Sequence, residues 1–287
     1  MSLQPLTVAD ILANPDSAGL ALVKHEIFGN TKDEVILEQV RHNLARGLPE
    51  ITANSPKRRI GQRAISLCGS APSLMQNLHH LTGKVLAFNA AIPALHKAGV
   101  RVDYAMIWDA TPEMVRYCLD VPGCEWLIAS RVNPAVIDKL LDLGQKVTLW
   151  HAADAEPAIQ ALLRGRLMIL GGVQSVTRGS FVAGVLGFRD LHIFGADSSY
   201  GNETHIGGSL RDEKEVVCMF ENVGFRTTMW MMHQAESWVT FVLPELVPTG
   251  MRFTVYGDGL LPAGHRSWLR QCLPWYKRLA WRWSPWW

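Results

Sequence analysis

The segment Ala64-Ile-Ser-Leu-Cys-Gly-Ser-Ala-Pro-Ser-Leu74 decides the fold prediction. A short, mostly apolar run, Ala64–Cys68, ends at a turn of small residues, and helical apolar spacing follows over Ser73–Leu81. A short apolar run bounded by turn residues is typical of a buried strand, and a strand followed at once by a helix begins a β-α-β unit. Recurrence of this pattern therefore predicts a parallel sheet.

The same pattern recurs along most of the chain. Further strands are predicted at Lys84–Phe88, Tyr104–Trp108, Glu125–Ala129, Lys146–Trp150, Leu167–Leu170 and Leu191–Phe194. Helical segments are predicted between them at Ala90–Lys97, Pro112–Leu119, Pro134–Leu143, Pro157–Leu163 and Val176–Leu186. Successive strands begin roughly twenty residues apart, which leaves room for a crossover helix of about ten residues. We expect the α/β class, namely a Rossmann-like, mostly parallel sheet with helices on both faces.

Helical additions are expected at both ends of this α/β domain. The predicted division is a helical N-terminal extension (1–60), the α/β domain (61–260) and a Trp/Arg-rich C-terminal tail (261–287). Val35–Leu44 has helical spacing, and Arg252–Tyr256 is predicted as the last strand. The segment Asp212–Leu246 is predicted to be mainly helical, and its methionines are expected to fill the core: Met219, Met229, Met231 and Met232.

Composition excludes several classes of protein. The chain has 287 residues, a formal net charge of +2 and 48% hydrophobic residues, so it can bury a core and has no general excess of basic residues for nucleic acid. Its five cysteines form no C-x-x-C pair, which argues against a disulfide framework or a zinc ribbon. We see neither a signal peptide nor an apolar run long enough to span a bilayer. The expected location is the cytoplasm.

The C-terminal tail is unusual because five of the eleven tryptophans lie from Trp275 to Trp287. Tryptophan combined with lysine and arginine suits a membrane interface or a contact between protein copies. Packing of the tail on its own domain is the competing explanation. The alternatives for this tail are thus peripheral attachment to the inner membrane, a homo-oligomer contact, and a structural role.

Candidate ligand-binding residues follow the first three predicted strands, because an open parallel sheet binds ligands beyond the carboxyl ends of its strands. After the first strand, Gly69 allows close approach of a ligand, and Ser70 and Ser73 offer hydroxyls before a helix N-terminus. Asn89 follows the second strand and can pair with a base or ribose, although a helix cap is the competing role. Asp109 follows the third strand and can orient a sugar hydroxyl or a metal-bound phosphate, with an N-cap as its alternative.

Two later turns add further candidates. Gly172 and Ser175 precede a helix of small residues and are predicted to lie beside a phosphate or sugar. The long polar turn Gly195–Gly208 contains Asp197, a second carboxylate that can orient hydroxyls or a metal, and His205. An imidazole titrates near neutral pH, so His205 is the predicted general acid or base, with a solvated loop residue as the alternative. The identity of any metal is left open.

Several of these turns together resemble the MptE-like domain. The likeness covers about residues 60–260 and rests on the order of five stretches: Ile65–Leu74, Val102–Asp109, Gly172–Tyr200, Gly201–Gly208 and Tyr256–Leu260. The pair Ser70-Ala71 departs from the small-glycine pair that is usual in the family. A weaker likeness extends to bacterial sialyltransferases that have a Rossmann-like nucleotide site.

The resemblance implies a transferase that binds a nucleotide or nucleotide-sugar. One branch of the family comprises 6-hydroxymethylpterin diphosphokinases, which use ATP with Mg²⁺. Another comprises the motility accessory factors, which are flagellin glycosyltransferases that use a CMP-activated, sialic-acid-like sugar. The stretch with Thr204-His205 favours a CMP-sugar donor, with the diphosphokinase as the first alternative and a non-catalytic binding or assembly protein as the second. The donor, the acceptor and the oligomeric state are left open.

Overall fold

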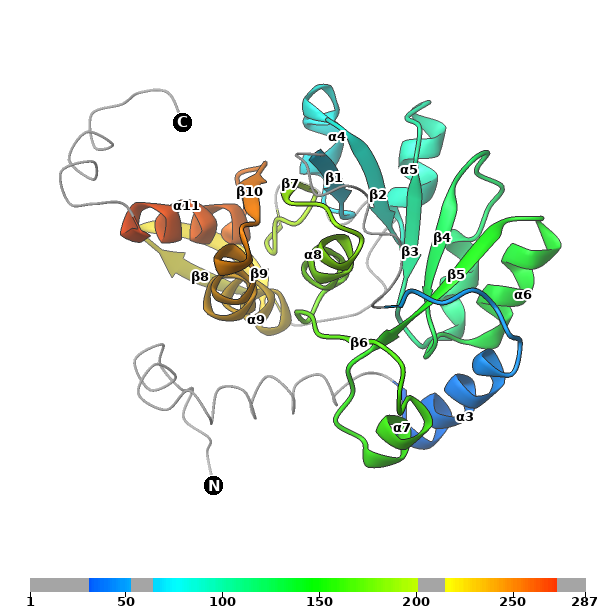
Figure 1. Cartoon of the computed structure of the whole chain (residues 1–287). Coiled ribbons are helices and arrows are strands. Elements are labelled where there is room, and N and C mark those ends of the chain that lie inside the picture. Colours follow the sequence, from blue (N-terminus) through cyan, green and yellow to red (C-terminus); the bar gives the residue numbers. More distant parts are fainter. Residues whose placement is uncertain (1–30, 53–63, 201–214, 273–287) are drawn as a thin grey trace.

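The computed structural model describes residues 31–52, 64–200 and 215–272. Its centre is an eight-stranded sheet in which every pairing is parallel (Figure 1). The strands are β1 Ala64–Cys68, β2 Lys84–Phe88, β3 Tyr104–Ile107, β4 Glu125–Ala129, β5 Lys146–Ala152, β6 Met168–Ile169, β7 Asp190–Phe194 and β10 Arg252–Val255. The predicted α/β class and parallel sheet are confirmed.

The order of the strands across the sheet is β10-β7-β1-β2-β3-β4-β5-β6. The chain advances from β1 to β6 in one direction, then returns to place β7 on the other side of β1. Strand order therefore reverses between β1 and β7. In open α/β sheets, such a reversal marks the place where the turns diverge and ligands bind.

Helices cover both faces of this sheet. The helices between β1 and β5 lie on one face, and the returning helix α8, Ser175–Val185, lies on the other, as the usual right-handed crossover predicts. The first set comprises α4 Ser73–Gln76, η1 Leu78–His80, α5 Ala91–Lys97, η2 Pro112–Tyr117 and α6 Pro134–Asp142. On the α8 face, Gly179 lies so close to the ring of Phe88 that any added Cβ would overlap it.

The central strands are apolar on both sides because they are buried on both faces of the sheet. All strand residues of β4 beyond Glu125, and of β5 beyond Lys146, are buried. The tryptophans of β4 and β5 are fully enclosed and still satisfy their indole N–H groups: Trp126 donates to Gln145 Oε1 at 3.0 Å and Trp150 donates to the Leu127 carbonyl at 3.3 Å. Buried indole rings of this kind add a large apolar area to the core.

Helix α3, Asp33–Leu44, packs beside the carboxyl edge of the sheet together with α7, Pro157–Leu162. Ile36 and Val40 form a small apolar cluster with Ile159 of α7. Asn43 is fully buried and donates to the carbonyls of Ser130 and Val132, which follow β4, at 3.0 and 2.8 Å. The predicted N-terminal helix is thus confirmed over Asp33–Leu44, and it is fixed to the turns beyond β3 and β4.

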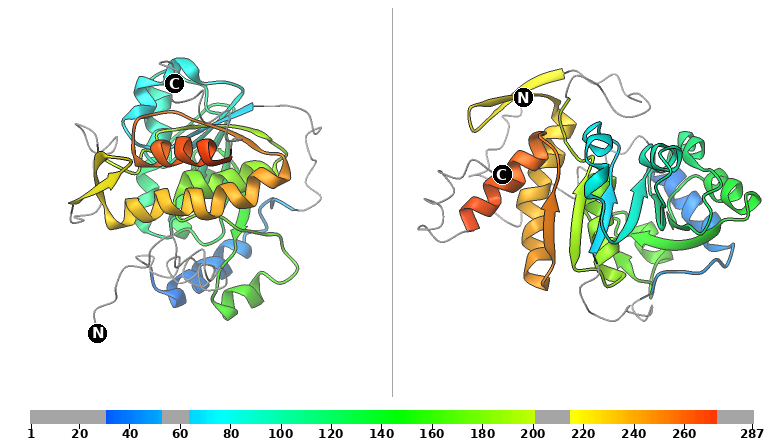
Figure 2. Two further views of the ribbon diagram at one scale, coloured as in Figure 1. Left: turned by 90° about the vertical axis from the view of Figure 1, so that its left-hand side faces the viewer. Right: turned by 90° about the horizontal axis from the view of Figure 1, so that it is seen from above.

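The C-terminal part forms a second layer beside the α8 face (Figure 2). It contains the antiparallel hairpin β8 Glu215–Phe220 and β9 Val223–Thr228, followed by α9 Met229–Ser237, η3 Trp238–Val242, α10 Leu243–Leu246 and η4 Val247–Thr249. Helix α11, Leu260–Cys272, follows β10. Trp238 is fully buried, meets Phe253 of β10 edge to face, and donates to His265 Nδ1 of α11 at 3.3 Å.

One element prediction is wrong. Residues 215–228 were expected within a mainly helical segment, but they form the β8–β9 hairpin. The run Val216–Phe220 alternates between exposed and half-buried positions, and the turn residues Glu221 and Asn222 both have positive φ. This is the backbone of a tight hairpin turn, which matches the twist of antiparallel strands. Met219 and Met229 are consequently exposed rather than in the core, whereas Met231 is buried.

The predicted helix Ser73–Leu81 is divided into the short helix α4 and the 3-10 turn η1. Most of the other predicted elements agree with the structure to within a residue or two. Strands β3, β6 and β10 are shorter than predicted, and β5 is longer. No helix in residues 31–52, 64–200 and 215–272 has the length and hydropathy needed to cross a membrane.

We expect Asn43→Ala to lower the free energy of unfolding by about 2–3 kcal/mol, because it leaves two buried carbonyls without donors. Urea denaturation followed by circular dichroism measures this loss. Glu38→Ala on the same helix is the matched control, since Glu38 makes only an exposed ion pair and its loss costs less than about 1 kcal/mol. Equal costs for the two variants would contradict the role of Asn43 in fixing α3.

We expect His265 to weaken the fold at acid pH. Burial lowers the pKa of His265 to about 4, whereas the unfolded chain takes up this proton near the ordinary value of 6.5. Stability is therefore lost as pH falls from 6.5 to 4, by about 3 kcal/mol in total. His265→Gln keeps an acceptor for Trp238 and should flatten this part of the pH–stability curve. An identical acid slope in both proteins would refute the assignment.

Candidate functional site

The carboxyl edge at the reversal of strand order is built around two glycines in close contact. A Cβ on Gly69, which follows β1, would overlap the carbonyl oxygen of Gly195, and a Cβ on Gly195 would overlap that of Gly69. Backbone bonds join the two turns: Gly69 N–H donates to the Phe194 carbonyl at 2.8 Å, and Ala71 N–H to the Gly195 carbonyl at 3.0 Å. The structure therefore gives Gly69 a packing role between two turns, and its predicted contact with a nucleotide stays a prediction.

Ser73 and Asp197 are brought together at this edge. Ser73 Oγ donates to Asp197 Oδ1 at 2.6 Å, both residues are buried, and Gly257 packs directly against them. Burial raises the pKa of Asp197, the hydrogen bonds from Ser73 oppose that rise, and the nearby negative charge of Asp258 adds to it. Asp197, which was predicted to orient hydroxyls, therefore already accepts a hydrogen bond from Ser73, which was predicted to bind the ligand.

The turn after β7 is held by three hydrogen bonds from two elements, α11 and β9. The Asp197 carbonyl accepts from Leu261 N–H at 3.0 Å, and Ser199 Oγ accepts from Leu260 N–H at 3.1 Å, both at the start of α11. Thr227 Oγ1 of β9 donates to the Ser198 carbonyl at 2.9 Å. Ser198 has a positive φ of 51°, which the surrounding bonds hold in place. Helix α11 and the hairpin therefore fix this turn through its backbone.

A second cluster of hydrogen-bonded side chains connects the ends of β2 and β3 with the start of α8. Asn89 Nδ2 donates to Ser175 Oγ at 3.3 Å, and Trp108 Nε1 donates to the same oxygen at 3.1 Å. Asn89 has a left-handed backbone with φ of 47°, and its buried Oδ1 has no hydrogen-bond partner among the described residues. Asn89 does not cap α5, because no side-chain cap bond is present at that N-terminus. A buried polar atom without a partner calls for an explanation, and binding of a ligand is one hypothesis.

Two arginines border this group, and the sequence prediction missed them. The guanidinium carbons of Arg178 and Arg131 lie 4.5 and 5.6 Å from the centre of the Trp108 ring. Arg178 is buried on α8, and Arg131 follows β4 and pairs with Asp154 beyond β5 at 3.4 Å. Arg131 and Asp154 could have been found by the strand-end rule that found Asn89. Arg178 lies one turn into α8, where no sequence signal distinguishes it from a surface arginine.

The remaining predicted residues have more local roles or lie outside the described part of the chain. Asp109 Oδ1 accepts from Thr111 N–H at 3.1 Å, which closes a small turn. Gly172 is buried, and a Cβ there would overlap the side chain of Thr177 in the first turn of α8. Ser70 is half-buried beside this edge. His205 lies outside the described residues, so its role in proton transfer stays a prediction.

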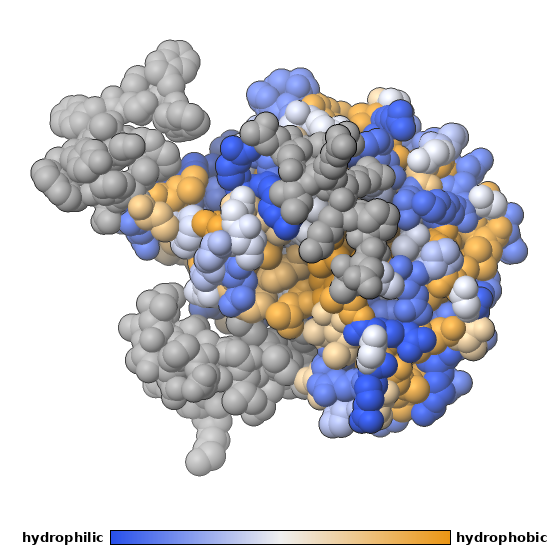
Figure 3. Space-filling view, in the orientation of Figure 1, coloured by the Kyte–Doolittle hydropathy of each residue, from blue (hydrophilic) through white to orange (hydrophobic). Residues whose placement is uncertain are grey.

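The Ser73–Asp197 pair and the Asn89–Ser175 pair both lie next to helix α8. Gly69 lies against Val176, the second residue of α8, and Ser175 is the first. Ser73–Asp197 and Asn89–Ser175 therefore lie along one edge, with the N-terminus of α8 next to both turns. Apolar surface is also visible at the centre of this face (Figure 3). Leu170, which leads into α8, is 56% exposed.

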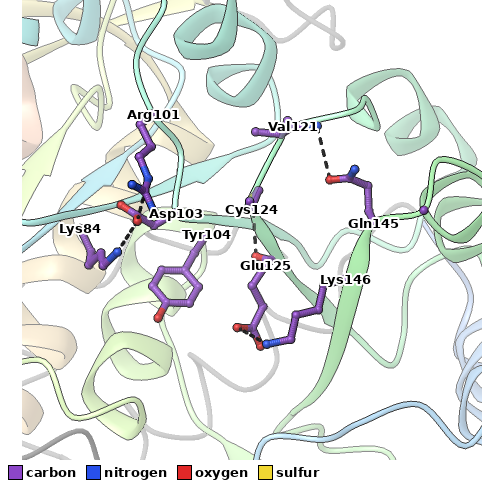
Figure 4. A pocket seen from close by; sticks show the side chains of 11 residues that line it. Lys84, Arg101, Asp103, Tyr104, Val121, Cys124, Glu125, Gln145 and Lys146 are labelled. Carbon is purple, nitrogen blue, oxygen red and sulfur yellow. Dashed lines mark hydrogen bonds and ion pairs between the residues drawn. The ribbon is translucent and has the colours of Figure 1, made fainter.

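A cavity of about 330 Å³ lies at the opposite, amino-terminal edge of β2–β5 (Figure 4). Its charges pair with one another: Lys84 and Arg101 with Asp103, and Lys146 with Glu125. Mutual neutralisation leaves little unpaired charge for a ligand, and we assign none. Within residues 31–52, 64–200 and 215–272, no three His, Cys, Asp or Glu side chains gather as a metal site.

The fold and the polar turns at its strand-order reversal define a Rossmann-like α/β protein with a candidate binding edge beside α8. The chain belongs to the MptE-like family, because the family model described as 6-hydroxymethylpterin diphosphokinase MptE-like matches residues 35–203. The predicted family is therefore confirmed. The match begins within α3, inside the predicted N-terminal extension.

A solved structure similar to this chain is the MAf glycosyltransferase from Magnetospirillum magneticum AMB-1. The TM-score is 0.61 at 14% sequence identity, and the match covers 91% of this chain. At this identity the likeness shows a shared fold. The chain spans 44% of the length of that glycosyltransferase. No curated protein matches the sequence.

We expect the cost of Ser73→Ala to depend on pH. A bond to the charged carboxylate of Asp197 is worth about 2 kcal/mol, and a bond to its protonated carboxyl group is worth about 1 kcal/mol. Because burial raises the pKa of Asp197, the variant should cost more at a pH above that pKa than at a pH below it. Denaturation curves at the two pH values measure the difference. Ser180→Ala is the matched control, because Ser180 donates to the uncharged Val176 carbonyl and its loss should cost the same at both. A pH-independent cost for Ser73→Ala would show that Asp197 is not its charged partner.

Proposed function

We propose that this protein is a transferase that binds the nucleotide of an activated donor between the end of β2 and the start of α8. The observation that carries this proposal is the strained Asn89, whose amide contacts Ser175 while its Oδ1 remains unpartnered among the described residues. A left-handed asparagine is held here at a cost in free energy. Binding a polar ligand is a physical reason for retaining it, since an amide can donate and accept together.

The position favours an anionic ligand. Helix α8 has eleven residues, and the N–H groups of a first helical turn lack acceptors within the helix. Ser175 adds a hydroxyl at that turn, and Arg131 and Arg178 add positive charge around Trp108. Phosphate oxygens are stabilised by helix N-termini and by guanidinium groups. This supports a phosphate of the donor at the start of α8, with the base or ribose toward Asn89.

For the donor we propose a CMP-activated, sialic-acid-like sugar, so that the reaction is glycosyl transfer. The fold shared with a structure titled as a glycosyltransferase supports this choice. The predicted His205 would move the proton of the acceptor or leaving group. In this account Ser73 and Asp197 hold the turns in place, and Asp109 shapes the turn after β3.

Transfer of diphosphate from ATP is the second candidate, because the matching family model is described by a pterin diphosphokinase. Mg²⁺ is commonly held by one or two carboxylates together with substrate phosphates. Asp197, one oxygen of which already accepts from Ser73, and the nearby Asp258 are the carboxylates that would hold it. A bound Mg²⁺ would supply charge neutralisation for the phosphates. Binding of ATP only with Mg²⁺, and no binding of CMP, would favour this candidate.

We expect Asn89→Gly and Ser175→Ala each to weaken CMP binding about tenfold, which corresponds to the loss of one hydrogen bond of about 1.4 kcal/mol. Isothermal titration with CMP, and separately with ATP and Mg²⁺, measures the dissociation constants. Glycine accepts the left-handed backbone without strain, so Asn89→Gly removes the amide while retaining the fold.

The matched control is Asn222→Gly, because Asn222 also has a positive φ, of 65°, but lies in the β8–β9 turn. This variant should bind CMP like the wild type. CMP binding that is equally strong in wild type and Asn89→Gly would overturn the proposed position of the nucleotide.

A further inference from the structure

Arg131, which follows β4, has hydrogen-bonding capacity that its neighbours do not use. Its side chain is only 13% exposed, and its Nη1 meets Asp154 Oδ2 at the long distance of 3.4 Å. Its Nε is buried and has no hydrogen-bond partner in the part of the chain that the structure describes. A guanidinium group presents five N–H donors, and burying donors without acceptors costs free energy. An acceptor supplied by a ligand would remove this cost.

The backbone on both sides of Arg131 is fixed by helix α3. Asn43 of that helix donates to the carbonyls of Ser130 and Val132 at 3.0 and 2.8 Å. The side chain is held as well, because Asp154 is only 12% exposed and contacts its guanidinium group. A residue whose position is fixed before a ligand arrives loses little conformational entropy on binding. Arg131 is therefore preorganised at the carboxyl edge of the sheet.

Arg131 lies next to the proposed phosphate position. The strands β2, β3 and β4 are neighbours in the sheet, so Asn89, Trp108 and Arg131 follow one another along its carboxyl edge. Trp108 connects the two positions, because its Nε1 donates to Ser175 Oγ at 3.1 Å and its ring centre lies 5.6 Å from the Arg131 guanidinium carbon. Arg178, in contrast, belongs to α8 itself. Guanidinium groups are thus offered by two separate elements, α8 and the turn after β4.

We propose that Arg131 is a specificity-determining residue, which binds a second anionic group of the donor beyond the phosphate at the start of α8. This inference rests on the proposed nucleotide site. Guanidinium groups bind carboxylate and phosphate oxygens alike through paired N–H donors. With a CMP-activated donor the second group is the carboxylate of the sugar, and with a nucleoside diphosphate it is the second phosphate. Asp154 is a positioning residue in this account, since it contacts one nitrogen and leaves the others to the ligand.

The test compares the dissociation constants of CMP, CMP-N-acetylneuraminate and CDP by isothermal titration of the full chain. CMP carries one phosphate, and the other two ligands add a carboxylate and a second phosphate, respectively. Wild type should bind at least one of these two about tenfold more tightly than CMP. Arg131→Met should reduce that preference to about twofold or less, while its affinity for CMP changes by less than about twofold. The ligand whose preference is lost shows whether the second group is a carboxylate or a phosphate.

A second variant guards against a loss of folding. Arg131→Met/Asp154→Asn removes both charges, so that no buried carboxylate is left unpaired, and it should lose the preference as the single variant does. Arg131→Lys keeps a charge beside Asp154 without the paired donors, and its preference should be intermediate. The matched control is Arg116→Met on η2, because the Arg116 guanidinium carbon also lies over an aromatic ring, 4.7 Å from the centre of Tyr117. This control should keep the wild-type preference.

The ratio of affinities separates ligand binding from a structural role, since a damaged fold weakens all three ligands together. The inference is overturned if the Arg131 variants weaken every ligand by the same factor, if they keep the wild-type preference, or if wild type has no preference. Failure of wild type to bind any of the three ligands is a different result, because it refutes the proposed nucleotide site and this inference with it.

Discussion

The contact between Gly69 and Gly195 is the constraint on which the arrangement of the binding edge depends. The two turns that follow β1 and β7 approach so closely that neither position has room for a Cβ. This approach lets Ala71 N–H reach the Gly195 carbonyl and brings Ser73 within hydrogen-bond distance of Asp197. It also brings Gly69 against Val176 in the first turn of α8. A larger residue at either glycine would separate the turns that the candidate site requires.

The polar residues at this edge divide into two kinds. Ser73 and Asp197 are buried and bonded to each other, and the turn after β7 is fixed by backbone bonds to α11 and β9. Asn89 is different, because its backbone is strained and one polar atom has no partner in the described part of the chain. The first kind stabilises the fold, whereas the second has a capacity for hydrogen bonding that a ligand can use. This difference places the proposed nucleotide contact at Asn89 and Ser175.

Much of the fold could be predicted because its determinants are local. The strand Ala64–Cys68 and the start of α6, where Asn133 accepts from Ala135 N–H ahead of Pro134, follow from a few neighbouring residues. The β8–β9 hairpin was missed because Val216–Phe220 is apolar throughout, and its alternating exposure is created by packing on one side only. The docking of α3 through Asn43 depends on carbonyls that follow β4, far away in the sequence.

The candidate site could be predicted only in part, because its residues follow strand ends but their partners lie far away in the sequence. The rule that ligands bind beyond strand ends found Asn89, Ser73 and Asp197. It could not show that Ser73 and Asp197 are hydrogen-bonded to each other. It also did not find the arginines around Trp108, since Arg178 reaches that ring only through the placement of α8. Side-chain partners across the sheet edge depend on strand order, which the sequence pattern does not specify.

Hydrogen exchange with and without CMP tests the central claim most directly, because a bound ligand protects the amides that it contacts or orders. The account predicts slower exchange in two segments far apart in the sequence, 88–91 and 174–178, with no change at the amino-terminal edge of the sheet, 101–104 and 121–125. Protection confined to that opposite edge, or no protection anywhere at saturating CMP, would contradict it.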